Sequence, residues 1–247
     1  MAWAVVGLAL IPFGASAQWR TPWSYNGLRG PAHWGTLDPD YALCNQGRAQ
    51  SPIDIEKTRV APLPDLHFSY RPGPLTITNN GYTALRADYL PGNGNILEVG
   101  GKRYELAQFH FHHPSEERIH GKAYAMVLHL MHRDGQGRIV GVAVFVREGR
   151  ANPAIAELWR SMPEQPAADH PIPGARFNPA ALLPANRTYY SYQGSQTAPP
   201  CQEGVTWFVL KTPIEASAGQ IESFAKLYPH DVRPVQPLDG RVVEESR

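Results

Sequence analysis

Apolar and polar residues alternate most sharply between Gln108 and His112. In an extended strand successive side chains point to opposite faces, so Gln108, His110 and His112 share one face while Phe109 and Phe111 share the other. The segment predicts a strand with an apolar face and with two imidazole rings on its other face.

A second segment of the same character runs from Ala123 to His132, and Val127, His129 and Met131 share one of its faces. The turn-rich stretch from Pro114 to Lys122 separates the two segments and favours antiparallel pairing, in which directly opposed side chains lie about 5 Å apart. The imidazole of His129 can then converge on the first two rings.

Short apolar runs separated by turn-forming residues continue along much of the chain, and short connections favour antiparallel pairing. The predicted strands are Leu75–Asn79, Thr83–Asp88, Ile96–Val99, Lys102–His113, Ala123–His132, Arg138–Val146 and Val205–Leu210.

Helical patterns are few. Asn152 to Arg160 predicts a short helix with proline near its start, and Ser217 to Tyr228 predicts a second helix that opens with a capping box. Pro163 to Pro184 is expected to be a proline-rich surface loop, and Gln18 to Ala49 an irregular segment over the body of the domain.

The chain has 247 residues, 43% of them hydrophobic, which is enough for one sizeable core, and we expect a single domain. The formal net charge of +1 gives no broad basic surface. Partners such as nucleic acid or an anionic membrane are therefore not indicated. We expect a monomer or a dimer.

The first residues, Met1 to Ala17, contain no charged side chain and end in the small-residue pattern Ala15-Ser16-Ala17. This is typical of a secretory signal peptide cleaved before Gln18, which leaves a domain over residues 18–247 and predicts a periplasmic or secreted protein. Because no Lys or Arg precedes the apolar run, an uncleaved anchor and a truncated gene start are alternatives.

Three neutral histidines without a fourth protein ligand are typical of a catalytic zinc site, which leaves one position open for water. His110, His112 and His129 are the candidates, with Gln108 as a partner for an outward-facing ring nitrogen. The alternative for any single one of them is an ordinary strand histidine.

Several motifs accompany the histidines: Gln50-Ser51-Pro52-Ile53-Asp54, Gln108-Phe109-His110-Phe111-His112, Pro114-Ser115-Glu116, Gly194-Ser195-Gln196-Thr197-Ala198-Pro199-Pro200-Cys201 and Arg233-Pro234-Val235-Gln236-Pro237. In order and spacing they resemble the α-class carbonic anhydrases of the exported bacterial type, from about Trp23 to the C-terminus. The resemblance implies a mainly β (α+β) fold, with a large twisted, mostly antiparallel central sheet and a few short peripheral helices.

The resemblance also implies a function: zinc-dependent, reversible hydration of carbon dioxide to bicarbonate and a proton, by attack of a zinc-bound hydroxide. Zn²⁺ would sit on the three histidines. By resemblance, Thr197 accepts a hydrogen bond from the hydroxide and passes one to Glu116. The implied carbon dioxide pocket contains Gln196, Ala198, Met131, Val142 and Trp207. Ordinary core packing is the alternative for the last three.

The two cysteines, Cys44 and Cys201, are most simply interpreted as one disulfide in an oxidising compartment. Two unpaired buried thiols are the alternative. Cys201 follows Pro199-Pro200 as the bridged cysteine does in bacterial members of the family that the motifs resemble, which favours the bridge.

Several positions depart from the family pattern. Val127 stands where the family has a glutamate behind the third histidine, and loss of such a partner typically costs about 10- to 100-fold in metal affinity or activity. Tyr82 stands where fast members carry a proton-shuttling histidine, and a phenol ordinarily titrates near pH ~10. Gln196 replaces a leucine of the pocket wall. Ala198 and Glu117 also differ, with effects that the sequence does not determine.

These departures keep three functions open. The first is a carbonic anhydrase with activity below that of fast members. The second is a related binding or structural protein with an impaired site, which Val127 and Gln196 favour. The third is slow ester hydrolysis at the same metal, which an activated-ester assay separates from hydration.

Overall fold

The computed structural model describes residues 21–83, 85–166 and 170–247, so the predicted signal segment Met1–Ala17 lies outside the described residues. Within them, a 12-stranded sheet has the order β12-β4-β5-β7-β10-β11-β14-β13-β15-β2, while β6 pairs with β7 and β3 pairs with β6. These strands are β2 (Arg59–Val60), β3 (His67–Ser69), β4 (Gly73–Thr78), β5 (Arg86–Asp88), β6 (Ile96–Val99), β7 (Lys102–His112), β10 (Met126–Arg133), β11 (Ile139–Glu148), β12 (His170–Phe177), β13 (Tyr189–Ser195), β14 (Glu203–Ala216) and β15 (Glu244–Glu245).

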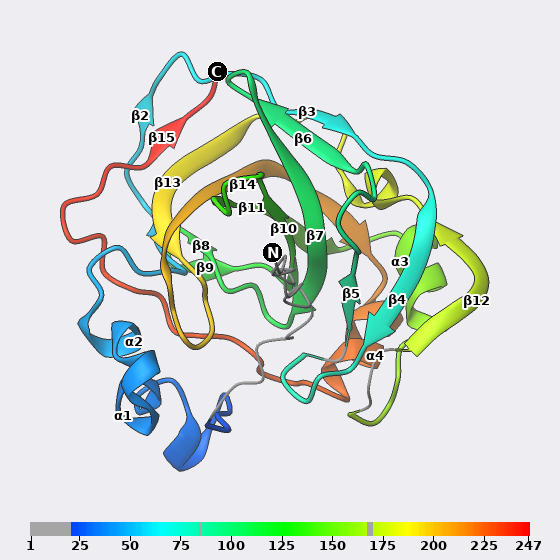
Figure 1. The fold of residues 1–247 in the computed structure, drawn as a ribbon, viewed down its shortest axis with the longest axis horizontal. Coiled ribbons are helices and arrows are strands. Elements are labelled where there is room, and N and C mark those ends of the chain that lie inside the picture. Colours follow the sequence, from blue (N-terminus) through cyan, green and yellow to red (C-terminus); the bar gives the residue numbers. More distant parts are fainter. Residues whose placement is uncertain (1–20, 84, 167–169) are drawn as a thin grey trace, which may run out of the picture.

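Most neighbours in this sheet are antiparallel, as predicted, but β11 runs parallel to β14 and β15 runs parallel to β2. A small second sheet has the order β1-β8-β9 and consists of β1 (Asp54–Ile55), β8 (Arg118–Ile119) and β9 (Lys122–Ala123). The helices are short and lie around the sheets (Figure 1): η1 (Gly27–Arg29), α1 (Trp34–Leu37), η2 (Pro39–Tyr41), α2 (Leu43–Gln46), α3 (Pro153–Trp159), η3 (Pro179–Leu182) and α4 (Ala218–Ala225).

The predicted antiparallel pair at the centre of the sheet is confirmed. β7 and β10 lie side by side, with His110 opposite His129 and His112 opposite Val127. A register irregularity lies beyond them, between Met131 and His132. The pairing places the histidines of β7 and His129 of β10 on the same side of the sheet.

The two faces of the sheet bury different clusters. One face carries Phe109, Phe111 and Leu130 and packs against α3 and α4 through side chains such as Ile155 and Phe224. The other face carries Val127, Ala143, Phe145, Trp207 and their neighbours. Because both faces are covered, the polar side chains near Trp207 lie inside the protein, where an unpaired polar atom is costly.

The predicted helices are both present, and the capping box of α4 is confirmed, because Ser217 accepts from the Gln220 backbone while the Gln220 side chain accepts from the Ser217 backbone. The segment from residue 21 to Ala49 is less irregular than expected. It contains helical turns of three or four residues, which are too short to produce a periodic pattern in the sequence.

The prediction of a surface loop from Pro163 to Pro184 is wrong in part. β12 and η3 occupy its second half, and Phe177 and Leu182 are buried. β12 is an edge strand, and its pairing with β4 is interrupted between Pro171 and Arg176. Proline is tolerated at such edges and bulges, so the prolines that indicated a loop are compatible with this strand.

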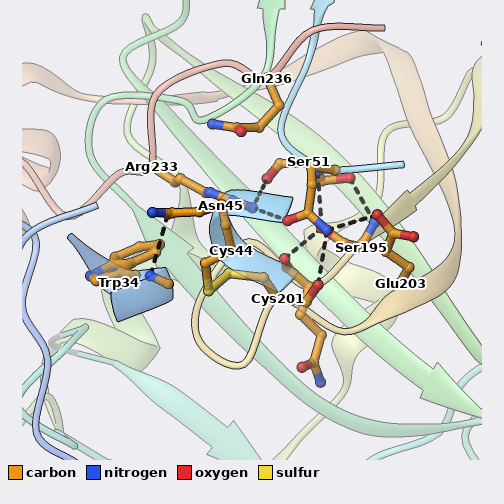
Figure 2. The surroundings of a disulfide bond; sticks show 12 residues. Trp34, Cys44, Asn45, Ser51, Ser195, Cys201, Glu203, Arg233 and Gln236 are labelled. Atoms are coloured by element: carbon orange, nitrogen blue, oxygen red, sulfur yellow. Dashed lines mark hydrogen bonds between the residues drawn. A yellow bond between two sulfur atoms is a disulfide. The ribbon is translucent and has the colours of Figure 1, made fainter. Parts of the chain in front are cut away.

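The predicted disulfide between Cys44 and Cys201 is present and ties α2 to the loop after β13. Arg233 lies beside it (Figure 2) and donates to the carbonyl oxygens of Cys44 and Ser51 and to the Gln50 side chain, each at 2.7 to 2.8 Å. Among the described residues, no helix is both long and apolar enough to cross a membrane.

Candidate metal centre

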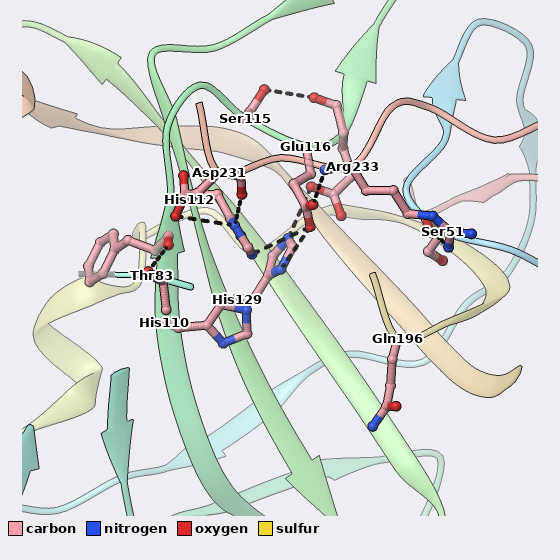
Figure 3. A network of polar contacts seen from close by, with 12 residues as sticks. Ser51, Thr83, His110, His112, Ser115, Glu116, His129, Gln196, Asp231 and Arg233 are labelled. Carbon is pink, nitrogen blue, oxygen red and sulfur yellow. Dashed lines mark hydrogen bonds and ion pairs between the residues drawn. The ribbon is translucent and has the colours of Figure 1, made fainter. Parts of the chain in front are cut away.

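Three imidazole rings meet where β7 and β10 pair. His110 and His112 come from alternate positions of β7 and His129 comes from β10, so all three project from the same face (Figure 3). One ring nitrogen from each lies within 4.8 Å of the others. Strand alternation and register are sufficient to explain why these side chains converge.

The N–H group on the other nitrogen of each ring donates a hydrogen bond to an oxygen. His110 Nδ1 lies 2.8 Å from the side-chain oxygen of Gln108, and His112 Nδ1 lies 2.6 Å from the backbone oxygen of Asp231. His129 Nε2 lies 3.1 Å from Glu117 Oε2. These acceptors fix the protonated nitrogen of each ring and leave His110 Nε2, His112 Nε2 and His129 Nδ1 facing the common centre.

The inward nitrogens fit a metal ion. His112 Nε2 and His129 Nδ1 are buried and have no hydrogen-bond partner. A buried acceptor without a partner is costly, whereas a metal ion at the common centre accepts its lone pair. Among the described residues, the group that could hold a metal ion consists of three imidazole nitrogens, a set that suits a transition-metal ion rather than Mg²⁺ or Ca²⁺, which prefer oxygen.

The electrostatics of two rings also favour metal binding. Burial lowers the pKa of His110 and of His112 well below the ordinary value, and neighbouring histidines lower both further. Burial lowers the pKa of His129 as well, but the charge and hydrogen bond of Glu117 outweigh it and leave that pKa raised. Neutral imidazole is the form that binds metal, and His110 and His112 are held in that form.

A buried carboxyl group lies next to the three rings. Glu116 Oε1 accepts from the Arg233 backbone at 2.8 Å, while Oε2 lies 3.4 Å from His112 Nε2 and 3.8 Å from His129 Nδ1. Burial raises the pKa of Glu116 to about 7; His129 lowers it, Glu117 raises it, and hydrogen bonds from Arg233 and Thr197 lower it. Thr197 thus joins Glu116 to the open side of the site.

A pocket of about 130 Å³ opens onto the rings. Met131 and Trp207 form an apolar wall of the pocket near His129. Gln196 also lines the pocket, and its side-chain oxygen is buried without a hydrogen-bond partner. Tyr82 stacks on Trp23, with ring centroids 3.9 Å apart. The lining residues are Trp23, Tyr25, Asn80, Tyr82, Thr83, Arg86, Gln108, His110, His112, His129, Met131, Gln196, Thr197, Ala198, Pro199 and Trp207.

The placement of Val142 in this pocket is wrong. Ala143 lies opposite His129, so Val142, one residue earlier, faces the other cluster and is fully buried there. Gly141 shares the pocket face, and a Cβ at that position would approach the Trp207 ring to 2.6 Å. The absent side chain therefore makes room for Trp207.

Two partners of the rings are absent from the sequence-based set. The backbone oxygen of Asp231 carries no side-chain signature, so no sequence pattern identifies it. Glu117 stands out only as a changed position beside Glu116, and its contact with His129 depends on how the loop after β7 folds. Val127, expected as a partner position, carries no polar atom and packs in the apolar cluster.

Known proteins are similar over nearly the whole chain. The family model for eukaryotic-type carbonic anhydrase matches residues 29–247. A carbonic anhydrase from Nostoc sp. is 42% identical over 232 residues, 91% of this chain and 86% of that protein. One from Klebsiella pneumoniae is 42% identical over 98% of this chain and 97% of its own length.

Solved structures show the same similarity. The α-carbonic anhydrase of Thermovibrio ammonificans, in complex with the inhibitor sulfanilamide, superposes with a TM-score of 0.86 at 43% identity, covering 91% of this chain and 99% of that one. A complex of dioscorin with ascorbate gives a TM-score of 0.83 at 28% identity and covers 91% of this chain and 97% of the other.

Proposed function

The chain belongs to the eukaryotic-type (α) carbonic anhydrase family and is a carbonic anhydrase, and we propose that it hydrates carbon dioxide with a zinc ion held by His110, His112 and His129. The observation that carries the proposal is the convergence of three inward ring nitrogens, two of them buried without a hydrogen-bond partner. A three-nitrogen set with an open fourth position is the arrangement of catalytic zinc.

When bound, zinc supplies an acidified water that serves as the nucleophile near neutral pH. The surrounding residues orient that nucleophile. Thr197 would accept a hydrogen bond from the attacking oxygen and donates its own proton to Glu116, whose Oε1 is held by the Arg233 backbone. A fixed acceptor directs the lone pair of the nucleophile toward carbon dioxide at little reorganisation cost.

The pocket beside the rings supports an apolar gas as substrate. Met131, Trp207 and Ala198 offer carbon surface, and the space of about 130 Å³ suits a small molecule. Gln196 is the polar exception on this wall.

We expect the enzyme to turn over carbon dioxide more slowly than fast family members do. Tyr82, stacked on Trp23, stands where fast family members carry a proton-shuttling histidine, so this position offers no imidazole for proton transfer. Proton transfer to solvent then depends on dissolved buffer. A hydration rate that rises steeply with buffer concentration supports proton transfer through buffer, and a rate independent of buffer concentration contradicts it.

We also propose that the protein works in an oxidising compartment, the periplasm or the exterior. The Cys44–Cys201 disulfide supports this location, because such bonds persist where thiols are not kept reduced.

The test is stopped-flow carbon dioxide hydration on protein whose zinc content is quantified, with His112→Ala as the control. Hydration that scales with bound zinc and is lost in the control supports the proposal. Full zinc occupancy without hydration contradicts the assignment of the substrate, and a protein that takes up no zinc contradicts the assignment of the metal.

A further inference from the structure

The third histidine of the site has a carboxylate behind it that does not come from its own strand. Position 127, two residues before His129 on the same face of β10, carries a valine that packs among apolar side chains. The oxygen that His129 Nε2 faces, at 3.1 Å, belongs to Glu117. Glu117 lies just before β8, and both Glu117 and His129 are fully buried.

We propose that Glu117 is the positioning residue of the metal centre, replacing from the loop the carboxylate that Val127 removes from β10. Relative to the family pattern, the carboxylate is missing at position 127 and present at position 117. Both positions are buried, and the carboxylate of Glu117 reaches the ring nitrogen of His129 that the family glutamate would face. The inference rests on the proposed zinc site and deepens it.

The effect of this contact on the ring is specific. A carboxylate at Nε2 keeps the proton on that nitrogen, turns Nδ1 toward the centre and strengthens it as a ligand. Gln108 and the Asp231 backbone do the same for His110 and His112 with neutral oxygens. Glu117 is therefore the ionisable member among the three oxygen partners.

The loop holds Glu117 in place from both sides. The Ser115 hydroxyl donates to the Glu117 carbonyl at 2.7 Å, and the Arg118 backbone donates to Ile53 at 3.2 Å, which joins β8 to β1. Fixed backbone on each side limits the positions that the Glu117 side chain can adopt. A contact between two fully buried and anchored residues is suited to orienting a ligand.

The experiment measures zinc dissociation, using excess chelating dye, from the wild type and from four variants. These are Glu117→Val, Glu117→Gln, the exchange Glu117→Val with Val127→Glu, and Gln220→Ala as a control for lost stability far from the site. The exchange nearly conserves buried volume and returns a carboxylate to β10. Glu117→Gln keeps the shape of the side chain and removes its charge, so it carries the test if Glu117→Val does not fold.

We expect zinc to leave Glu117→Val about 10- to 100-fold faster than the wild type, to leave Glu117→Gln faster to a smaller extent, and to return toward the wild-type rate in the exchange variant. Gln220→Ala should release zinc at the wild-type rate. Unchanged dissociation from both Glu117 variants overturns the inference while leaving the zinc site intact. Rapid loss from the exchange variant assigns Glu117 a merely structural role, and absence of zinc from the wild type contradicts the proposed function itself.

Discussion

Gln196 places a polar amide on the apolar side of the pocket, and its buried Oε1 has no hydrogen-bond partner in the protein. Water held there has to be displaced by an apolar substrate. We expect Gln196→Leu to lower KM for carbon dioxide by about fivefold, the equivalent of about 1 kcal/mol, with little change in kcat. Stopped-flow hydration at varied carbon dioxide concentration measures both constants.

The matched control is Gln193→Leu, the same change at an exposed position of β13 outside the pocket. Its KM should equal that of the wild type. A KM that does not fall in Gln196→Leu shows that the amide does not obstruct the substrate.

His132 gives a prediction on pH. It faces away from the metal centre, is fully buried and shares a hydrogen bond with the Tyr70 hydroxyl group. Burial lowers its pKa from 6.5 to about 4. Between these values the unfolded chain binds a proton that the folded protein does not, so the contribution of His132 to stability falls as pH falls from about 6.5 to about 4, by about 3 kcal/mol in total.

The measurement is urea unfolding of metal-free wild type and His132→Gln at pH 7 and pH 4.5. The wild type should lose more stability between the two pH values than the variant does. Comparing the two proteins cancels the buried groups that they share, such as His110 and Glu116, whose titration has its own effect. Equal losses in both proteins contradict a buried neutral His132.

Individual residues also mark the limit of prediction from sequence. Alternation along β7 and β10 is a local property, so the convergence of the three histidines follows from the pattern. Glu117 does not, because its contact with His129 is set by the path of a loop. The placement of Val142 in the pocket is wrong because the register between β10 and β11 puts Ala143, and not Val142, opposite His129.

At the scale of elements, α3 and α4 are joined by one side chain. Gln220 of α4 accepts from the Asn152 backbone at 2.9 Å and donates to its carbonyl at 2.7 Å, while the Trp159 ring donates to the Gln220 backbone. Together these contacts fasten the pair of helices that covers Phe111.

We expect Gln220→Ala to lower the free energy of unfolding by about 2 kcal/mol, because two side-chain hydrogen bonds and the capping box are lost. Urea denaturation measures the change. Glu222→Ala on the same helix is the control, since that side chain is exposed, and it should change stability by less than about 0.5 kcal/mol. A similar loss in both variants contradicts a specific stabilising role of the link to α3, since alanine itself favours the helix.

Elements with a sustained pattern were predictable and those without one were not. The capping residues and the apolar stripe of α4 predict a helix. The prolines of β12 instead indicate a loop, and they are tolerated in a strand because β12 lies at the edge of the sheet. The parallel pairing of β11 with β14 joins segments distant in the sequence. Short-range patterns carry no information on such a pairing.

For the whole molecule, the disulfide connects two regions that are far apart in the sequence. Cys44 and Cys201 are 157 positions apart, and Trp23, Trp34 and Tyr41 pack around them. Breaking the bond enlarges the conformational freedom of the unfolded chain, and the chain-entropy estimate for a loop of this length is about 5 kcal/mol.

We therefore expect dithiothreitol to lower the free energy of unfolding of the wild type by up to about 5 kcal/mol and to leave a Cys44→Ala, Cys201→Ala double variant unaffected.

The same cluster contributes Trp23 to the pocket wall, and Arg233, which holds Glu116, donates to the Cys44 carbonyl. If the packing of these aromatic residues depends on the disulfide, reduction should also slow carbon dioxide hydration under conditions in which the protein is still folded. Lost stability with unchanged hydration would show that the disulfide acts on the unfolded chain alone, and unchanged stability would show that the packed aromatic layer holds the termini of the loop together without it.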